Sequence, residues 1–401
     1  MGDGSWGDCL VGVSVAVDAK LEALREQLPA VLGTGYFNAG SNGPLPMVAH
    51  EALIRAAAAE VETGRIVPGL YEGNRDRNRR VAGVVAEVCN ADPDEIALTH
   101  STTEGLSAAL MGLNWRRGDE VVTTELEHPG LLAPLCLLAY RFGVVLRYAK
   151  IGMGEGDVAG AIEAAVTTRT RAIALSHLMW SSGAIVPLAE IAEVARRRGI
   201  LLIVDGAQAA GQIPLDLHGL GIDAYAMAGQ KWLCGPEATG ALYIRRDRFA
   251  EIAPTFLRYA ERLDPSGYLV PAASAMRYEI GEFYGPAVLA QETALVWLRD
   301  EVGLDWAYER TAAMGRRCWE GLSRIDRVTV TTPRERKAGL VCFKTEGMTP
   351  QEMTAKLYER NLTIRYVDYR PGPTIARVAA AWWNTEEEVD RLVAAVGEVA
   401  E

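Results

Sequence analysis

Short apolar runs alternate with longer amphipathic stretches through the first two thirds of the chain. Between the apolar runs lie helical patterns such as residues 187–199, which begin with proline and end with glycine. Near-continuous hydrophobic strands separated by helices are typical of a mostly parallel sheet that is covered on both faces. Ligands gather at the carboxyl ends of such strands. The predicted strands are residues 95–99, 120–124, 144–148, 172–176 and 200–205.

The pattern changes near residue 277, where long helical stretches lead into separate short strands and a final helix. The final helix is expected to begin at a capping box formed by Thr385 and Glu388. This pattern predicts a smaller α/β domain. The helices are expected at 286–302 and 306–325, and the strands at 328–330, 340–343 and 377–383. The predicted organisation is an N-terminal segment packing on the small domain (1–35), a large domain (36–276) and a small C-terminal domain (277–401).

Composition and charge exclude several classes of protein. A chain of 401 residues is too long for one compact core. The net charge of -11 argues against a nucleic-acid partner. No apolar run approaches the roughly 18 residues of a membrane span, and the N-terminus has acids where a signal peptide needs bases. The six cysteines are scattered without C-x-x-C spacing, so neither a metal site nor a redox motif is expected, and we predict a cytoplasmic protein.

Two candidate catalytic residues follow apolar strands. Asp205 comes directly after the most hydrophobic strand, where a carboxylate is poorly solvated and needs a cationic partner. A protonated pyridinium nitrogen is one such partner, and a helix cap is the structural alternative. Lys231 follows a short strand near residues 225–228 and has apolar neighbours. Desolvation favours the neutral amine, which condenses with an aldehyde.

Three further segments suggest ligand contacts. Residues 99–105 place hydroxyl groups at the start of a helix, where an anion such as phosphate binds. His128 ends a strand–turn and could stack on a flat ring, although a lone histidine is often structural. Arg377 is expected to begin an apolar strand. A guanidinium there is costly unless it meets an anion such as the carboxylate of an amino acid.

In this order and spacing, the motifs resemble the class V aminotransferase and cysteine desulfurase group of pyridoxal 5'-phosphate (PLP) enzymes. The resemblance covers nearly the whole chain. It implies the aspartate aminotransferase-like fold type I, with a mostly parallel seven-stranded sheet in the large domain. The matching segments are Tyr36-Phe-Asn-Ala-Gly40, Gly43-Pro-Leu-Pro46, Ser101-Thr-Thr-Glu104, Glu127-His128, Asp205-Gly-Ala-Gln208, Gln230-Lys231-Trp232, and Arg377 followed by Asn384-Thr-Glu-Glu387.

The resemblance implies how the ring of the cofactor is held. Lys231 would be the Schiff-base lysine and the proton shuttle at Cα of the substrate. Asp205 would pair with the pyridine nitrogen, and Gln208 would bond the ring oxygen. His128 would stack on the ring.

The resemblance also implies contacts to the phosphate and to the substrate. Thr102, Thr103 and Gln230 would bind the phosphate, although relatives usually carry histidine at the last position. Arg377 would hold the carboxylate of an amino-acid substrate, which Asn42 would face. A homodimer with active sites at the interface is expected.

Three departures from the family pattern change the expected chemistry. Ala228 stands where many relatives have a serine that contacts the phosphate. Glu282 stands where many have a threonine supplied by the partner subunit, and a carboxylate should repel phosphate. The loop 364–373 lacks the nucleophilic cysteine of desulfurases, so an enzyme-bound persulfide is not expected. Candidates in that loop for recognising a polar or acidic substrate are Arg365, Tyr366 and Arg370, and a solvated loop is the alternative.

Three reactions remain open at this stage. A carbon–sulfur β-lyase acting on cystine or a cysteine S-conjugate is favoured, because residues 230–236 look like that branch of the family. An aminotransferase shares the same removal of the Cα proton. An epimerase, as in isopenicillin N epimerase relatives, needs a second base on the opposite face. A PLP-fold protein that has lost catalysis and acts as a binding partner is the alternative from another class.

Overall fold

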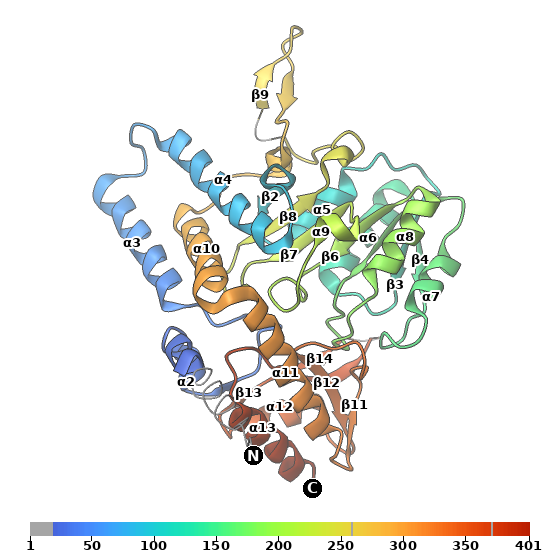
Figure 1. The fold of residues 1–401 in the computed structure, drawn as a ribbon. Helices are drawn as coiled ribbons and strands as arrows, with labels where there is room; N and C mark the ends of the chain where they lie inside the picture. Colours follow the sequence, from blue (N-terminus) through green and yellow to red (C-terminus); the bar gives the residue numbers. More distant parts are fainter. Residues whose placement is uncertain (1–18, 258–259, 370–371) are drawn as a thin grey trace, which may run out of the picture.

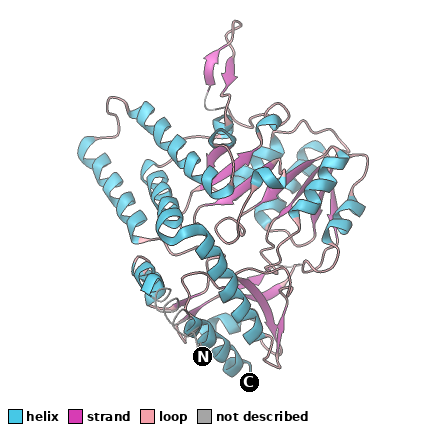
Figure 2. Ribbon diagram, viewed as in Figure 1, coloured by secondary structure: helices cyan, strands magenta, loops and turns pink. Residues whose placement is uncertain are grey.

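The computed structural model describes residues 19–257, 260–369 and 372–401. A large unit and a smaller C-terminal unit make up the chain (Figure 1). Helices lie on the outside of both units, and the strands gather into a sheet within each (Figure 2). The large unit therefore has the three-layer arrangement expected for α/β patterning.

A seven-stranded sheet in the order β2-β8-β7-β6-β5-β3-β4 forms the centre of the large unit. Every neighbouring pair is parallel except the two pairs that include β8. This confirms the predicted mostly parallel sheet and fold type I. The strands are β2 (Ile96–Thr99), β3 (Glu120–Thr124), β4 (Val145–Ala149), β5 (Thr170–Ser176), β6 (Leu201–Asp205), β7 (Ala224–Ala228) and β8 (Gly240–Ile244).

Helices cover both faces of this sheet because the strand side chains are apolar on both sides. On one face, Leu106 of α5 (Thr102–Met111) and Leu135 of α6 (Pro129–Phe142) share a buried cluster with Ile203. On the other face, residues of α7 (Val158–Ala165) and α8 (Leu188–Arg198) share a cluster with Leu202 and Val204. The alternation of 202, 203 and 204 between the two faces fits the two-residue period of a strand.

Long helices flank the large unit on the side of β2. Helix α10 (Gly285–Trp297) packs against α3 (Met47–Thr63) and α4 (Leu70–Cys89). A π-helical segment, Leu298–Gly303, joins α10 directly to α11 (Leu304–Leu322), where the sequence pattern predicted two separate helices. A hairpin of β9 (Ala260–Leu263) and β10 (Leu269–Pro271) projects from the large unit (Figure 1).

The C-terminal unit contains an antiparallel sheet in the order β11-β12-β15-β14. Helices α12 (Pro350–Tyr358) and α13 (Glu386–Ala400) pack with it, and α13 begins at the predicted Thr385–Glu388 capping box. The strands are β11 (Val328–Val330), β12 (Leu340–Thr345), β14 (Arg365–Asp368) and β15 (Thr374–Ala379).

Three expectations for this sheet were wrong. Arg377 does not begin its strand but is the fourth residue of β15. The predicted strand ended at residue 383, whereas the chain turns after Ala379, since the side-chain oxygen of Asn384 accepts a hydrogen bond from the Ala381 N–H. Part of the loop expected at 364–373 is also the strand β14.

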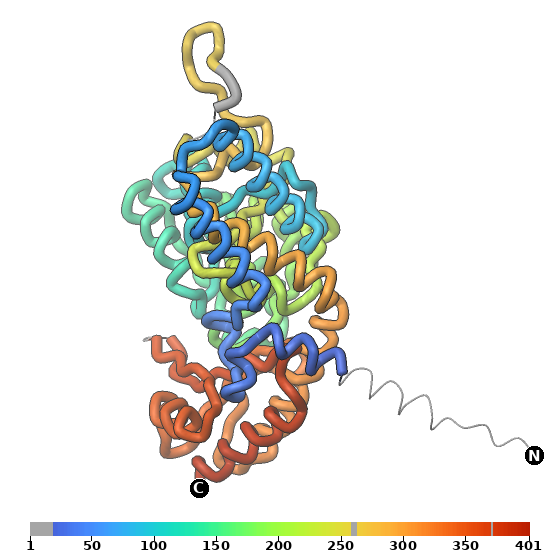
Figure 3. The backbone as a smooth tube through the Cα atoms, turned by 90° about the vertical axis from the view of Figure 1, so that its left-hand side faces the viewer, coloured from blue at the N-terminus to red at the C-terminus, as the bar shows by residue number. Residues whose placement is uncertain are grey.

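The described N-terminal residues lie against the C-terminal unit (Figure 3). Arg25 pairs with Glu388 of α13 at 2.6 Å, and β1 (Gly35–Tyr36) pairs with β13 (Leu362–Thr363). Residues 1–18 of the predicted N-terminal segment lie outside the described residues. The proposed domain boundaries stay predictions. No helix among the described residues is long and apolar enough to cross a lipid bilayer.

Candidate active site

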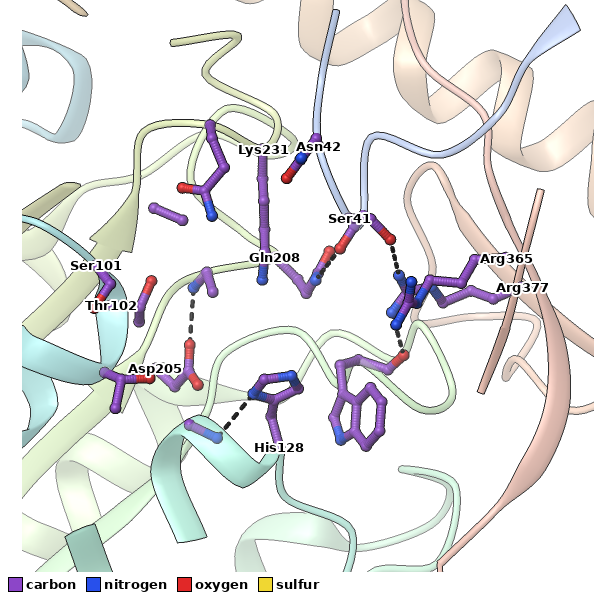
Figure 4. A pocket seen from close by; sticks show the side chains of 17 residues that line it. Ser41, Asn42, Ser101, Thr102, His128, Asp205, Gln208, Lys231, Arg365 and Arg377 are labelled. Carbon is purple, nitrogen blue, oxygen red and sulfur yellow. Dashed lines mark hydrogen bonds between the residues drawn. The ribbon is translucent and has the colours of Figure 1, made fainter. Parts of the chain in front are cut away.

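A cavity of about 420 Å³ lies where the carboxyl ends of the central strands meet the C-terminal unit (Figure 4). Asp205 ends β6, Lys231 follows β7, and His128 lies between β3 and α6. The side chains that can take part in catalysis therefore come from the ends of strands, as expected for this topology. Predicted site residues that line the cavity are Asn42, Thr102, Thr103, His128, Asp205, Gln208, Gln230, Lys231, Arg365 and Arg377.

The amine of Lys231 lies in an environment that favours its neutral form. Desolvation lowers its pKa to about 8, and the positive charges of Arg377 and Arg365 act in the same direction. The carboxylate of Asp205 opposes this shift. About a tenth of the amine is then neutral at pH 7, far more than for an ordinary lysine, which suits a nucleophile and a base.

Asp205 is a buried carboxylate with only 5% of its surface exposed. One oxygen accepts a hydrogen bond from the Ala207 N–H at 2.9 Å. Desolvation raises the pKa of Asp205, and Lys231 lowers it.

Nearby, the buried Glu127 accepts hydrogen bonds from Ser176. Desolvation raises the pKa of Glu127 to about 7, and Asp205 contributes to that rise. A cation beside Asp205 would stabilise both carboxylates.

His128 is held in one orientation at the start of α6. Its Nδ1 accepts a hydrogen bond from the Gly130 N–H at 2.9 Å, which leaves the proton on Nε2. Desolvation and the nearby Lys231, Arg377 and Arg365 lower its pKa to about 4. The imidazole is therefore neutral near pH 7 and offers a flat ring without a charge.

The start of α5 forms the polar end of the cavity. Ser101 caps this helix by accepting a hydrogen bond from the Glu104 N–H. The hydroxyl of Thr102 and the side-chain oxygen of Gln230 are buried without a partner among the described residues. The Thr102 hydroxyl and the NH2 group of the Gln230 amide can donate to an anion with several oxygens, such as a phosphate monoester, beside a helix N-terminus that also favours negative charge.

The loop after β1 closes the cavity over Lys231. The Gly43 N–H donates to the carbonyl of Gln230 at 2.8 Å, and a Cβ at Gly43 would lie 2.1 Å from the Lys231 carbonyl oxygen. Only glycine fits this close approach. Gln208 donates to the Gly40 carbonyl at 2.8 Å, and Asn42 donates to Glu237 at 2.8 Å. Gln208 keeps a second N–H for a ligand.

Two arginines form the wall contributed by the C-terminal unit. Arg377 on β15 and Arg365 on β14 are directly opposite each other in register and both line the cavity. Arg377 donates to the Trp180 carbonyl at 3.2 Å and to the Ser41 hydroxyl at 3.3 Å. No carboxylate among the described residues forms an ion pair with either arginine. The pair is therefore suited to an anionic ligand.

Three other candidates are not brought to this cavity. Tyr366 follows Arg365 in β14 and has 44% of its surface exposed, because successive strand side chains point to opposite faces. Arg370 lies outside the described residues. Glu282 does not line the cavity, and its backbone carbonyl bonds His100 at 3.3 Å. Whether a partner subunit uses Glu282 stays a prediction.

Sequence reasoning missed two residues of the site. Trp180 lines the cavity, and its ring lies edge-on to that of His128 with centroids 4.9 Å apart. Its position shortly after β5, at the same edge of the sheet as Asp205, was a usable signal. Ser41 bonds Arg377 and directly precedes Asn42, which the resemblance had placed near the substrate, so its position in the sequence was a usable signal.

The donor set fits PLP. The polar start of α5 suits its phosphate, the buried carboxylate of Asp205 suits its pyridinium nitrogen, and the amine of Lys231 suits its aldehyde. The neutral ring of His128 borders the same space. The fold and the site together define a fold type I PLP enzyme.

The comparisons with known proteins identify the family. The profile of the class V aminotransferase family matches residues 75–392, so the chain belongs to that family and its cofactor is PLP. Isopenicillin N epimerase of Streptomyces clavuligerus is 31% identical over 90% of this chain and 93% of its own. Probable cysteine desulfurase 2 of Mycobacterium leprae is 30% identical over 89% of this chain and 84% of its own.

A solved structure is similar in both fold and sequence. The cystine C–S lyase C-DES, in complex with its reaction product cysteine persulfide, has a TM-score of 0.87 and 31% sequence identity. The match covers 93% of this chain and 99% of that one. Because relatives include proteins called cysteine desulfurases, the expected exclusion of an enzyme-bound persulfide gains no support from these names and stays a prediction.

Proposed function

We propose that this enzyme is a carbon–sulfur β-lyase that acts on L-cystine or a cysteine S-conjugate. The observation that carries the proposal is the pair of Arg365 and Arg377 opposite Lys231, without a carboxylate partner among the described residues. One guanidinium binds the α-carboxylate of the amino acid, and the second binds a further anionic group. Cystine carries two carboxylates. The similarity to the cystine lyase C-DES supports the same substrate class.

Each residue has a defined task in this reaction. When bound, PLP withdraws electrons from Cα and makes its proton acidic. Arg377 fixes the α-carboxylate, which orients the Cα–H bond towards the amine of Lys231. Lys231, with a pKa of about 8, takes that proton and returns it to the departing sulfur. Asp205 holds the proton on the pyridine nitrogen, and His128 excludes water from one side of the ring.

The reaction balances without an oxidant or reductant. Cystine and one water give cysteine persulfide, pyruvate and ammonia. An S-conjugate gives the free thiol in place of the persulfide. Among the described residues that line the cavity there is no cysteine. In the proposed reaction the sulfane sulfur therefore leaves on the product rather than on the enzyme.

Product analysis tests this proposal against the two other reactions. Purified holoenzyme is incubated with L-cystine without a keto acid, and pyruvate, ammonia and thiol are measured over many turnovers. Equal accumulation of pyruvate and ammonia supports the lyase. Product limited to one equivalent until a keto acid is added would identify an aminotransferase, and the D-isomer without pyruvate would identify an epimerase. Either result would overturn the proposal.

We also propose that the enzyme is a cytoplasmic homodimer. Large apolar side chains are exposed along one edge of the large unit, among them Val61, Ile66 and Tyr71 in and between α3 and α4. Several exposed large apolar side chains in one segment support an interface with a second copy. Sedimentation of the holoenzyme tests this assembly, and a monomer at micromolar concentration would contradict it.

A further inference from the structure

A second cavity of about 290 Å³ adjoins the active site. Leu126 and Leu132 come from the segment around the start of α6, Tyr148 comes from β4, and Tyr369 follows β14. Trp180 lines both this cavity and the catalytic one. The two spaces therefore meet at a single indole side chain.

Three aromatic side chains, Tyr148, Trp180 and Tyr369, line this side cavity. The rings of Trp180 and Tyr369 lie 6.0 Å apart at 70°. Burial raises the pKa of Tyr148, and the nearby Cys136 and Tyr369 act in the same direction. Tyr148 and Tyr369 remain 45% and 37% exposed, so their rings offer surface to a ligand. Flat apolar groups stack well in such surroundings.

Three charged side chains line the side cavity, namely Glu125, Glu127 and Lys150. Glu127 is buried and accepts hydrogen bonds from the hydroxyls of Thr124 and Ser176. The carboxylate of Glu125 is already hydrogen-bonded, because its two oxygens accept hydrogen bonds from the Ile151 and Gly152 N–H groups at 3.1 Å. Lys150 lines the same cavity and forms no ion pair within the part of the chain that the structure describes. Its ammonium is thus the charge available to a ligand.

We infer that the side cavity binds the leaving group of an S-aryl cysteine conjugate, with preference for an acidic substituent on the ring. This inference rests on the proposed lyase function. With the α-carboxylate on Arg377, the sulfur substituent extends past Trp180 and packs against the edge-to-face pair of Trp180 and Tyr369. The acidic substituent then meets Lys150. After the carbon–sulfur bond breaks, the aryl thiolate takes the proton from Lys231 and leaves as the thiol.

Selectivity between two substrates tests the inference. The holoenzyme is assayed for pyruvate with S-(4-carboxyphenyl)-L-cysteine and with L-cystine. Tyr369→Ala should lower kcat/KM about tenfold for the aryl conjugate, from loss of the aromatic contact, and leave cystine within about twofold. Lys150→Met should lower kcat/KM about threefold for S-(4-carboxyphenyl)-L-cysteine and leave kcat/KM for S-phenyl-L-cysteine unchanged.

Tyr140→Ala is the matched control, since Tyr140 lies on α6 with 89% of its surface exposed and does not line either cavity. It should leave both substrates unchanged. Equal losses for both substrates, or none, in Tyr369→Ala would overturn the side-cavity inference while cystine cleavage keeps the lyase function intact.

The absence of pyruvate from every sulfur substrate would overturn the lyase function instead. Calorimetric binding of S-(4-carboxyphenyl)-L-cysteine to the holoenzyme then decides the inference. Affinity about tenfold weaker in Tyr369→Ala sustains the side cavity as a binding site, and unchanged affinity rejects it.

Discussion

Replacing Arg377 with methionine tests the carboxylate clamp, because methionine keeps an apolar stem and removes the charge. Arg377 has 3% of its surface exposed, and its Nε is buried without a partner among the described residues. Desolvation lowers its pKa to about 10, with Arg365 acting in the same direction, so it is still charged at pH 7. A charge-assisted hydrogen bond contributes about 1.5–3 kcal/mol. The variant should lose about 10- to 150-fold in kcat/KM.

Steady-state formation of pyruvate from L-cystine measures this loss, with thermal melting to confirm that the variant is folded. Arg171→Met is the matched control, since Arg171 is exposed at β5 and does not line the cavity. The control should retain full activity. If Arg377→Met is folded and its kcat/KM stays within about twofold of the wild type, Arg377 does not bind the substrate carboxylate.

Three further perturbations test other residues of the site. Asp205→Ala should slow Cα proton exchange in D₂O, followed by NMR, at least about tenfold while PLP is retained; normal exchange would contradict its role at the pyridine nitrogen. In the apoprotein, His128 has a pKa near 4 instead of 6.5 because of desolvation. Between pH 6.5 and 4 the unfolded chain binds a proton on His128 that the folded chain does not, so the free energy of unfolding falls as the pH drops through this range. His128→Asn should reduce that fall by about 2 kcal/mol. A wild type and a variant that lose the same free energy of unfolding between the two pH values in denaturant titrations would refute this. Gly43→Ala should displace the Lys231 carbonyl, costing about 1–3 kcal/mol in melting experiments and lowering kcat, whereas an unchanged kcat would count against the close approach.

The large sheet could be predicted from the sequence because its strands are buried on both faces. Apolar runs such as the one ending at Asp205 lie within a residue or two of the observed strands. Since the carboxyl ends of parallel strands share one edge, Asp205, His128 and Lys231 could be expected together. The structure places all three at one cavity.

The C-terminal unit was harder to predict because its strands are short and its turns depend on side-chain hydrogen bonds. The apolar run that begins at Arg377 continues through Trp383, and periodicity alone does not show that Asn384 folds back to end it. Pairing between β14 and β15 brings Arg365 to the site and turns Tyr366 away. That register depends on contacts between distant segments, which no local pattern contains.

The roles proposed for the other site residues all depend on Lys231 being the lysine that carries the cofactor. Reduction of the purified holoenzyme with borohydride, followed by digestion and peptide mass spectrometry, tests it directly. We predict a phosphopyridoxyl group on the peptide that contains Lys231 and loss of the near-visible cofactor absorbance in Lys231→Ala. A label on another lysine, or full activity in Lys231→Ala, would contradict the account.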